Sequence, residues 1–318
     1  MTVRYEVKPS PGKGMGVFAK VNIKPDDIIL HDQARMKIPV HVYYGDDPQL
    51  MEQVHTHFEA LSQAHKQEYL QLYQGRSGHP SKIMRIYLAV SFHDPPRGTH
   101  AVVHLKLSLV NHSCRPNAEF SDVHNEQDTK LIGVRKIKKG EEVFVSYCGY
   151  HMNGDRARRQ KFFKDGFGFE CKCETCSLTG YALMLSDARR TLYRELSIRR
   201  AGASPTLPEI CNLIPGIKRA PNTVPGALTD HQKVAYAFIT AKVMEAEGMS
   251  GAIIGDCYLA CAQNLLAQVN DMAPLIVLPT IKLMHEWFGL SIKRIGAVRN
   301  SSNDDLQAMI EFWSLSRR

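Results

Sequence analysis

Three closely spaced cysteines give the strongest chemical signal in the sequence. Cys171, Cys173 and Cys176 follow the pattern Cys-x-Cys-x-x-Cys. Thiolates at such spacing are typical ligands of structural zinc, which takes four ligands in a tetrahedron. The alternative is that they are buried and behave as small hydrophobic side chains. The pattern favours a metal site, whose fourth ligand would come from another cysteine: Cys114, Cys148, Cys211, Cys257 or Cys261.

A second group of polar residues runs from Asn111 to Asn117 with the sequence Asn-His-Ser-Cys-Arg-Pro-Asn. It follows the apolar segment 104–110, which is expected to be a strand. Polar groups at the end of a buried strand must be hydrogen-bonded to one another, to the backbone or to a ligand. A single Asn-His pair there would often be only a satisfied turn. An unbroken run of such residues favours a functional site.

Glycines recur in the segment from Gly12 to Gly16, Gly-Lys-Gly-Met-Gly, between two expected strands. A dinucleotide-binding fingerprint would open a helix, and Val17 stands where Gly or Ala is required when the pattern starts at Gly12. The Gly-Lys-Ser/Thr ending of a phosphate-binding loop is also missing from the segment. The segment is therefore either a tight turn or a loop whose backbone approaches a ligand closely.

Basic residues are densest in the run from Arg156 to Lys164, which is expected to form a helix ended by Gly166 and Gly168. The formal net charge of the chain is +8 and is spread along its length. Nucleic-acid-binding proteins usually combine a dense basic stripe with aromatic side chains. We interpret the run as a solvated helix face, with a partner or substrate surface as the alternative, and expect no direct binding of nucleic acid.

Strands and helices that would position these groups follow from the apolar periodicity. Short strands separated by turns are expected over 4–7, 16–19, 27–31, 104–110, 118–123, 130–137 and 142–147. Helical spacing over 50–73 and 83–92 indicates a helical insert between the two groups of strands. Beyond residue 180 the expected helices are 183–199, 231–247, 253–270, 275–292 and 304–315. A Pro-rich stretch over 203–228 predicts a linker or extended loop.

Length and composition suit an intracellular protein of two domains. The chain has 318 residues, of which 44% are hydrophobic and 23% charged, and single cores rarely grow beyond about 250–300 residues. No sequence segment approaches the ~18 consecutive apolar residues of a membrane span, and the first residues lack an apolar signal core. Clustered cysteines indicate metal in a reducing compartment. We therefore expect a cytoplasmic or nuclear location and no membrane partner.

Four blocks of sequence, in this order, resemble the signature blocks of SET-domain lysine methyltransferases. They are Gly-Lys-Gly-Met-Gly-Val-Phe-Ala at 12–19, Asn-His-Ser-Cys-Arg-Pro-Asn at 111–117, Gly-Glu-Glu-Val-Phe-Val-Ser-Tyr at 140–147 and Phe-Glu-Cys-Lys-Cys-Glu-Thr-Cys at 169–176. The resemblance covers about residues 1–178. The order of the blocks and the helical C-terminal half resemble the SMYD group and related fungal SET proteins. The second set of zinc-finger cysteines that SMYD members carry in the insert is missing from this sequence.

The resemblance implies an α+β fold. A mainly-β SET domain over 1–178 would carry a helical insert at about 40–100 and a zinc-bound post-SET segment at about 166–178. An α-helical C-terminal domain would occupy 179–318. The implied cofactors are S-adenosylmethionine and zinc, and the implied partner is a protein substrate that presents a lysine side chain, although a small molecule is an alternative.

The resemblance also assigns roles to individual residues. The backbone of Lys13, Gly14, Met15 and Gly16 would line the cofactor. Asn111 and His112 would hold its methionine and adenine ends, and Phe169 would cover the adenine ring. Tyr147 would contact the cofactor and be the catalytic residue. Cys114 would complete the zinc site with Cys171, Cys173 and Cys176.

The chemistry of methyl transfer agrees with these roles. A lysine must lose its proton before it attacks, and an apolar channel lowers its pKa by desolvation. Alignment of the amine with the methyl group supplies much of the rate. A phenol with a pKa near ~10 is a poor base at neutral pH, so Tyr147 would orient the amine. Outside the motif, a strand tyrosine of this kind would be interpreted as core packing.

The sequence departs from the family pattern at one place. Relatives often show an Asn that helps to bind the cofactor upstream of the Asn-His pair, and local alignment puts Tyr87 in that position. Two alternative functions therefore accompany the main hypothesis of protein lysine methylation. One is a SET scaffold that acts on a small molecule, and the other is a catalytically silent module that binds partners.

Overall fold

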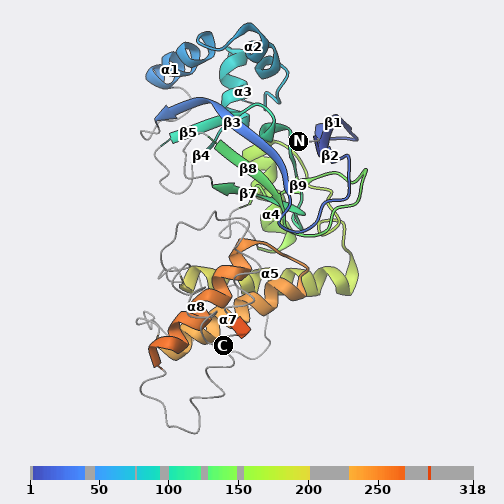
Figure 1. Ribbon diagram of the computed structural model, residues 1–318, viewed down its shortest axis with the longest axis vertical. Helices are drawn as coiled ribbons and strands as arrows, with labels where there is room; N and C mark the ends of the chain where they lie inside the picture. Colours follow the sequence, from blue (N-terminus) through green and yellow to red (C-terminus); the bar gives the residue numbers. More distant parts are fainter. Residues whose placement is uncertain are drawn as a thin grey trace. The chain divides into compact units, whose positions relative to one another are not determined.

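The computed structural model describes residues 3–39, 47–75, 77–93, 100–122, 128–148, 154–200, 229–268 and 286–287. These residues combine α-helices with mainly antiparallel sheets (Figure 1). The chain forms two compact units. The first contains residues 1–145 and 162–171, and the second contains residues 146–161 and 172–318. The domain boundary expected near residue 178 stays a prediction.

The glycine-rich segment forms the turn of an antiparallel hairpin, β1 (Tyr5–Ser10) and β2 (Gly14–Ala19). Ser10 pairs with Gly14, which leaves a three-residue turn closed by a 3.0 Å bond from the Lys13 N–H to the Ser10 carbonyl. Gly12 lies at φ 73°, in the left-handed region that side chains disfavour. The turn interpretation of this segment is therefore confirmed.

The main sheet of the first unit has five strands in the order β4-β5-β3-β8-β7, all antiparallel to their neighbours. Its strands are β3 (Ile28–Pro39), β4 (Phe92–His93), β5 (His100–His104), β7 (Ala118–Asp122) and β8 (Asp128–Gly133). The long strand β3 pairs with β5 over its second half and with β8 over its first half. It thus joins both parts of the sheet.

Three helices of the expected insert pack together above β3 and β5 (Figure 1). They are α1 (Pro48–Glu59), α2 (Gln63–Leu70) and α3 (Lys82–Val90). Asp47, Ser62 and Ser81 accept hydrogen bonds from the free N–H groups at the three helix starts, which explains where the helices begin. Apolar side chains of the helices form one core with those of β3 and β5. The helical insert is confirmed.

The strand expected over 104–110 is wrong beyond its first residue. Strand β5 ends at His104, and Leu107–Leu109 form a short 3₁₀ helix, η1. The buried Asp32 carboxylate accepts the Lys106 N–H at 2.7 Å and the Leu107 N–H at 3.1 Å. These bonds turn the chain because they satisfy the N–H groups that a continuing strand would donate to a neighbour.

The strand expected over 142–147 is also shorter than predicted. Only β9 (Phe144–Val145) forms a strand, parallel to the equally short β6 (Asn111–His112). Preceding residues face the hairpin instead: Glu142 bridges Phe18, and the Val143 N–H donates to the Val17 carbonyl at 2.7 Å. The segment 142–145 therefore pairs with β2 through its first two residues and with β6 through its last two.

The basic run forms α4 (Arg156–Phe162), which continues as a π-helical turn, η3 (Phe163–Phe167). Gly168 ends it at φ 71°, as the glycine pattern indicated. The interpretation of the run as a solvated face is wrong for Arg159, whose side chain is 0% exposed. Burial of this residue reflects partners from distant parts of the sequence, which helical periodicity alone does not indicate.

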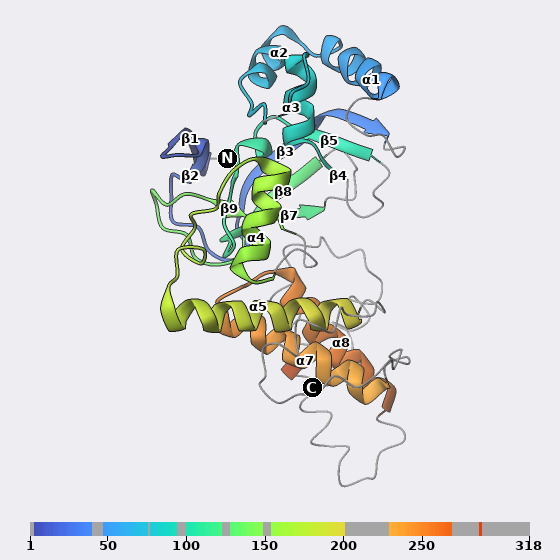
Figure 2. The same ribbon diagram turned by 180° about the vertical axis from the view of Figure 1, so that it is seen from behind.

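The second unit contains the long helices α5 (Gly180–Arg200), α7 (Asp230–Ala246) and α8 (Ala252–Gln268), which pack side by side (Figure 2). They confirm the helices expected over 183–199, 231–247 and 253–270. The expected loop 203–228 and helix 304–315 lie outside the described residues, as does all but 286–287 of the helix expected over 275–292. Among the described helices, not one is long and apolar enough to cross a membrane.

A histidine, His104 of β5, is buried within the main sheet. His104 is 1% exposed, and its Nε2 lies 3.2 Å from Thr129 Oγ1. Burial lowers the pKa of His104 below its usual range, against the opposing effect of the Asp32 charge. The folded protein therefore holds this ring neutral at pH values where the unfolded chain binds a proton.

We predict that the free energy of unfolding falls as the pH is lowered below ~6.5, the usual histidine pKa, because the unfolded chain then binds the extra proton. The slope from one such group is at most about 1.4 kcal/mol per pH unit. Urea unfolding between pH 7.5 and 5 should show a flatter profile for His104→Gln. His31→Gln, at an exposed position of β3, is the control. Parallel profiles for His104→Gln and the unaltered protein would contradict this assignment.

Candidate active site

Asn117 ties the polar segment 111–117 to the segment that carries β9. It is 2% exposed, and its amide nitrogen donates to the Glu142 carbonyl at 2.9 Å while its side-chain oxygen accepts the Phe144 N–H at 2.7 Å. Its backbone N–H donates to the Phe144 carbonyl at 3.2 Å, and its own carbonyl accepts the Val134 N–H at 2.9 Å. One buried side chain thereby supports the two-residue pairing of β6 with β9.

Asn111 and Glu142 connect this pairing to the glycine loop. The Asn111 amide nitrogen donates to the Met15 carbonyl at 3.0 Å and to Glu142 Oε1 at 2.8 Å. The other oxygen of Glu142 accepts the Ser10 hydroxyl at 2.9 Å and lies 3.4 Å from the Lys13 amine. The Lys13 amine also lies 4.3 Å from the centroid of the Phe144 ring. The carboxylate is thus the centre of the junction.

Only glycine fits at position 16 of this junction, because there is no space for a side chain. A Cβ at this position would lie 2.5 Å from Glu142 Oε1 and 3.0 Å from Asn111 Nδ2. The predicted loop residues Lys13, Gly14 and Met15 are exposed beside it. Sequence reasoning found the loop and Asn111 but missed Glu142 and Ser10. The sequence did contain a signal for Glu142, which is an acidic residue at the edge of an apolar strand pattern. A charged side chain in such a place needs hydrogen-bond or ion-pair partners.

His112 lies buried between a cysteine and an aromatic ring. Its Nε2 is 3.3 Å from Cys114 Sγ, and its ring centroid is 4.3 Å from that of Phe163 and 6.5 Å from that of Phe169. The predicted residues His112 and Phe169 therefore belong to one packed group, in which Phe163 is closer to each of them than they are to one another.

Aromatic rings from α4, η3 and the residues after them form this packed group. Phe163 and Phe169 stack with their centroids 5.1 Å apart and their planes 19° apart. Phe167 lies edge-on to Phe169 at 6.2 Å and to Phe162 at 5.5 Å. The left-handed Gly168 reverses the chain so that Phe169 returns onto Phe163, whose carbonyl accepts the Phe169 N–H at 3.3 Å. The result is an apolar wall of ring faces.

Tyr147 follows β9 by two residues and is half-buried. The chain turns there: the Ser146 hydroxyl donates to the Cys148 carbonyl at 3.1 Å and accepts the Cys148 N–H at 3.2 Å. This local turn ends the extended backbone directly around Tyr147. Its catalytic role stays a prediction.

The cysteines predicted as zinc ligands lie together. The Sγ atoms of Cys114, Cys171, Cys173 and Cys176 are all within 4.8 Å of one another, and three of the four residues are buried. A tetrahedron with Zn–S bonds of about 2.3 Å has sulfur–sulfur edges of about 3.8 Å, so this set needs little adjustment to hold a metal ion. The four thiols form no disulfide. The donor set therefore fits zinc.

The other candidates for the fourth ligand are placed differently. Cys257 and Cys261 lie in the core formed by α7 and α8, and Cys211 lies outside the described residues. Cys148 is half-buried, and burial raises the pKa of its thiol to about 12. Tyr87, in the position where relatives often carry Asn, is packed in the core of the helical insert, and burial raises its pKa to about 12.

Comparison with known proteins gives a match to the SET domain family over residues 14–148. Histone-lysine N-methyltransferase set5 of Schizosaccharomyces pombe is 29% identical over 189 residues, which cover 58% of this chain and 54% of that protein. Histone-lysine N-methyltransferase ATXR4 of Arabidopsis thaliana is 39% identical over 80 residues, 25% of this chain and 23% of that protein. Histone-lysine N-methyltransferase SMYD3 of Homo sapiens is 40% identical over 70 residues, 22% of this chain and 15% of that protein.

These matches confirm the resemblance to SET-domain lysine methyltransferases, including fungal and SMYD proteins. The chain covers about half the length of the fungal relative and less of the other two. The matched region contains the second strand of the hairpin, β2, together with the helical insert, the main sheet and the β6–β9 pairing. It therefore includes Asn111, Glu142 and the loop residues Gly14 to Gly16, whereas Ser10 and Lys13 precede it.

We predict that Asn117→Ala lowers the free energy of unfolding by about 2–4 kcal/mol, because it leaves the Phe144 N–H and the Glu142 carbonyl buried without these partners. Urea denaturation measures the change. Asn22→Ala is the matched control: the exposed Asn22 oxygen accepts the Lys139 N–H at 3.0 Å, and water can replace it there. Equal loss of stability in the two variants would show that Asn117 has no special role.

Proposed function

We propose that this chain, whose residues 14–148 form a SET domain, transfers a methyl group from S-adenosylmethionine to the side-chain amine of a protein lysine. The observation that carries the proposal is the SET-domain match, which includes Gly14 to Gly16, Asn111 and Tyr147. The names of the relatives, histone-lysine N-methyltransferases, support the same reaction class. The alternatives, a small-molecule substrate or a silent binding module, receive no support from these similarities.

The proposed cofactor site is built from the glycine loop, Asn111, His112 and Phe169. When bound, S-adenosylmethionine supplies a methyl group on a positively charged sulfur. Carbonyl oxygens and ring faces suit such a cation, and the loop of Lys13, Gly14, Met15 and Gly16 offers backbone where a side chain at Gly16 would clash. Asn111 holds this loop through the Met15 carbonyl. Phe169, stacked on Phe163, offers a ring face for the adenine.

Tyr147 is the proposed catalytic residue. Its hydroxyl would orient the neutral lysine amine, whose lone pair forms the new N–C bond as the S–C bond breaks and the sulfur keeps the electron pair. The methylated amine is left as an ammonium ion, and the one proton released overall is the proton that the lysine loses before it attacks. Orientation of this kind needs a hydrogen-bonding hydroxyl rather than a strong base. The turn around Ser146 and Cys148 would hold the ring in place.

Zinc is the proposed occupant of the four-cysteine site. Four thiolates suit a structural zinc ion, which supplies no open position for substrate. Its role would be to hold the segment 171–176 against Cys114. Because Cys114 follows His112 by two residues and its sulfur lies 3.3 Å from the His112 ring, metal binding would also fix a residue of the proposed cofactor site. The metal and cofactor sites would therefore be coupled.

The proposed substrate is a protein, in agreement with the histone-lysine activity named for the relatives. Such a substrate would place the enzyme in the nucleus or the cytoplasm. The helical second unit and the insert α1–α3 are the parts in which we expect specificity to lie, since the SET blocks themselves serve the cofactor and the chemistry.

We predict that purified protein given isotopically labelled S-adenosylmethionine and histones or cell extract labels lysine side chains. Tyr147→Phe should bind the cofactor normally but turn over at least ~10²-fold more slowly, if the hydroxyl contributes ~3 kcal/mol in the transition state. Tyr181→Phe, at a position in α5 that is 71% exposed, is the control. Label only in small molecules would refute the proposed substrate class, and near-normal turnover of Tyr147→Phe would refute its role.

Zinc content gives an independent prediction. Metal analysis of freshly purified protein should give one zinc per chain, and Cys173→Ser combined with Cys176→Ser should lose it, because two of the four thiolates are removed. Cys257→Ala, a change in the core of α7 and α8, should keep it. Metal removal should also weaken cofactor binding measured by calorimetry. Zinc-free native protein, or full retention in the double variant, would be incompatible with the site.

A further inference from the structure

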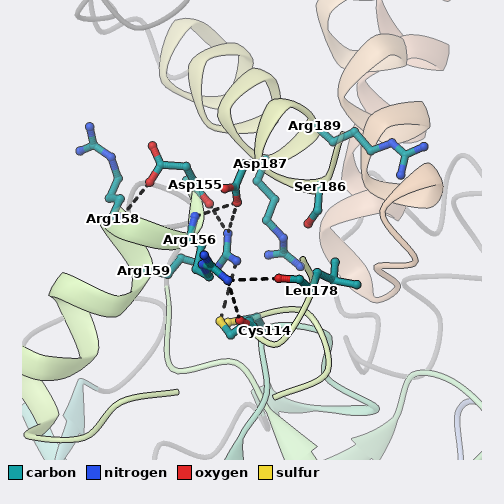
Figure 3. Close-up of polar contacts among 12 residues, drawn as sticks. Cys114, Asp155, Arg156, Arg158, Arg159, Leu178, Ser186, Asp187 and Arg189 are labelled. Carbon is teal, nitrogen blue, oxygen red and sulfur yellow. Dashed lines mark hydrogen bonds and ion pairs between the residues drawn. The ribbon is translucent and has the colours of Figure 1, made fainter. Parts of the chain in front are cut away.

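Two arginines of α4, Arg156 and Arg159, contact the segment 176–178, although the basic run was expected to face solvent. Figure 3 shows both side chains with Leu178 and Cys114. The Arg156 guanidinium donates to the Cys176 carbonyl at 3.4 Å and to the Leu178 carbonyl at 3.1 Å. The Arg159 guanidinium donates from Nη2 to Cys176 Sγ at 3.8 Å and from Nη1 to the Gly154 carbonyl. Residues three apart share a helix face, so both side chains reach the same segment.

The position of Arg159 is unusual for a charged side chain. It is fully buried, and burial of a cation is costly unless negative charge or strong acceptors compensate it. One carboxylate, that of Asp187 in α5, has an oxygen 3.7 Å from Arg159 Nη1, and this oxygen also accepts the Arg156 N–H at 2.7 Å. Asp187 is therefore shared between Arg156 and Arg159, and Cys176 Sγ is a second acceptor for the Arg159 guanidinium.

A zinc-thiolate centre would place negative charge at this sulfur. Zinc held by four thiolates carries two net negative charges, which are stabilised when N–H groups donate to the sulfurs. The donation from Arg159 to Cys176 is of this kind. An arginine suits the position because its planar group presents separate N–H donors in fixed directions, here toward Gly154 and toward Cys176, whereas a lysine amine has no such fork.

We propose that Arg159 is a positioning residue of the metal centre, which offsets the thiolate charge through Cys176 and connects the centre to α5 through Asp187. The inference rests on the proposed zinc site. It gives the basic run a function that involves neither nucleic acid nor a partner surface. It also predicts that Arg158, whose side chain extends away from Cys114 in Figure 3, contributes nothing to the metal.

The experiment measures zinc loss from the full-length, zinc-loaded protein to a coloured chelator, 4-(2-pyridylazo)resorcinol. Arg159→Met should weaken zinc binding at least ~10-fold, as expected for loss of a hydrogen bond to a metal ligand. Arg159→Lys, which keeps the charge but not the fork, should show a smaller loss, and Arg158→Met should match the unaltered protein. Asp187→Asn should weaken binding less than Arg159→Met, since it changes only the support of the guanidinium.

A second readout separates this role from packing alone. With Co²⁺ in place of zinc, the thiolate-to-metal charge-transfer bands should move to lower energy in Arg159→Met and Arg159→Lys, because loss of the donated N–H raises the energy of the sulfur electrons. Unchanged zinc affinity and unchanged bands in folded Arg159→Lys would overturn the inference while the zinc site stands. Unaltered protein without zinc would overturn both. If Arg159→Met does not fold, Arg159→Lys still decides.

Discussion

The pairing of Asn111–His112 with Phe144–Val145 is the constraint on which the candidate active site depends. Two residues on each side are too few to hold a sheet together, so the pairing needs the buried Asn117, which binds the opposite segment through both side-chain and backbone groups. With this pairing in place, Asn111 reaches the glycine loop, and His112 lies against Cys114 and Phe163.

Buried charge imposes a second constraint, and the protein meets it by joining distant segments. The part-buried Glu142 accepts hydrogen bonds from Ser10 and Asn111 and pairs with Lys13, so the loss of any of these residues would leave its carboxylate with fewer partners. In the second unit, Glu247 accepts both the Ser186 hydroxyl and the Arg190 guanidinium of α5. Such groups cost free energy to bury, and they favour one arrangement over others because alternatives would leave them unpaired.

Elements with strong local signals were predictable from the sequence. Apolar side chains at helical spacing indicated α1, α3, α5, α7 and α8, because the hydrogen bonds of a helix join residues only a few positions apart. The hairpin β1–β2 followed from its glycine turn, and the cysteine spacing indicated a metal site. Cys114 was one of five candidates for the fourth thiol until the resemblance to SET domains selected it, and the structure places its sulfur with the other three.

The sequence by itself therefore determined the residue types that could bind a cofactor and a metal, the order of their segments, and most helices. Tertiary structure alone decided how those segments meet. The Asp32 carboxylate ends β5 at His104, Glu142 faces the hairpin instead of continuing β9, and Arg159 is buried against Cys176. Each outcome depends on a partner far away in the chain. Periodicity records only whether a residue is apolar, so it contains no information about which distant polar atom will satisfy a buried one.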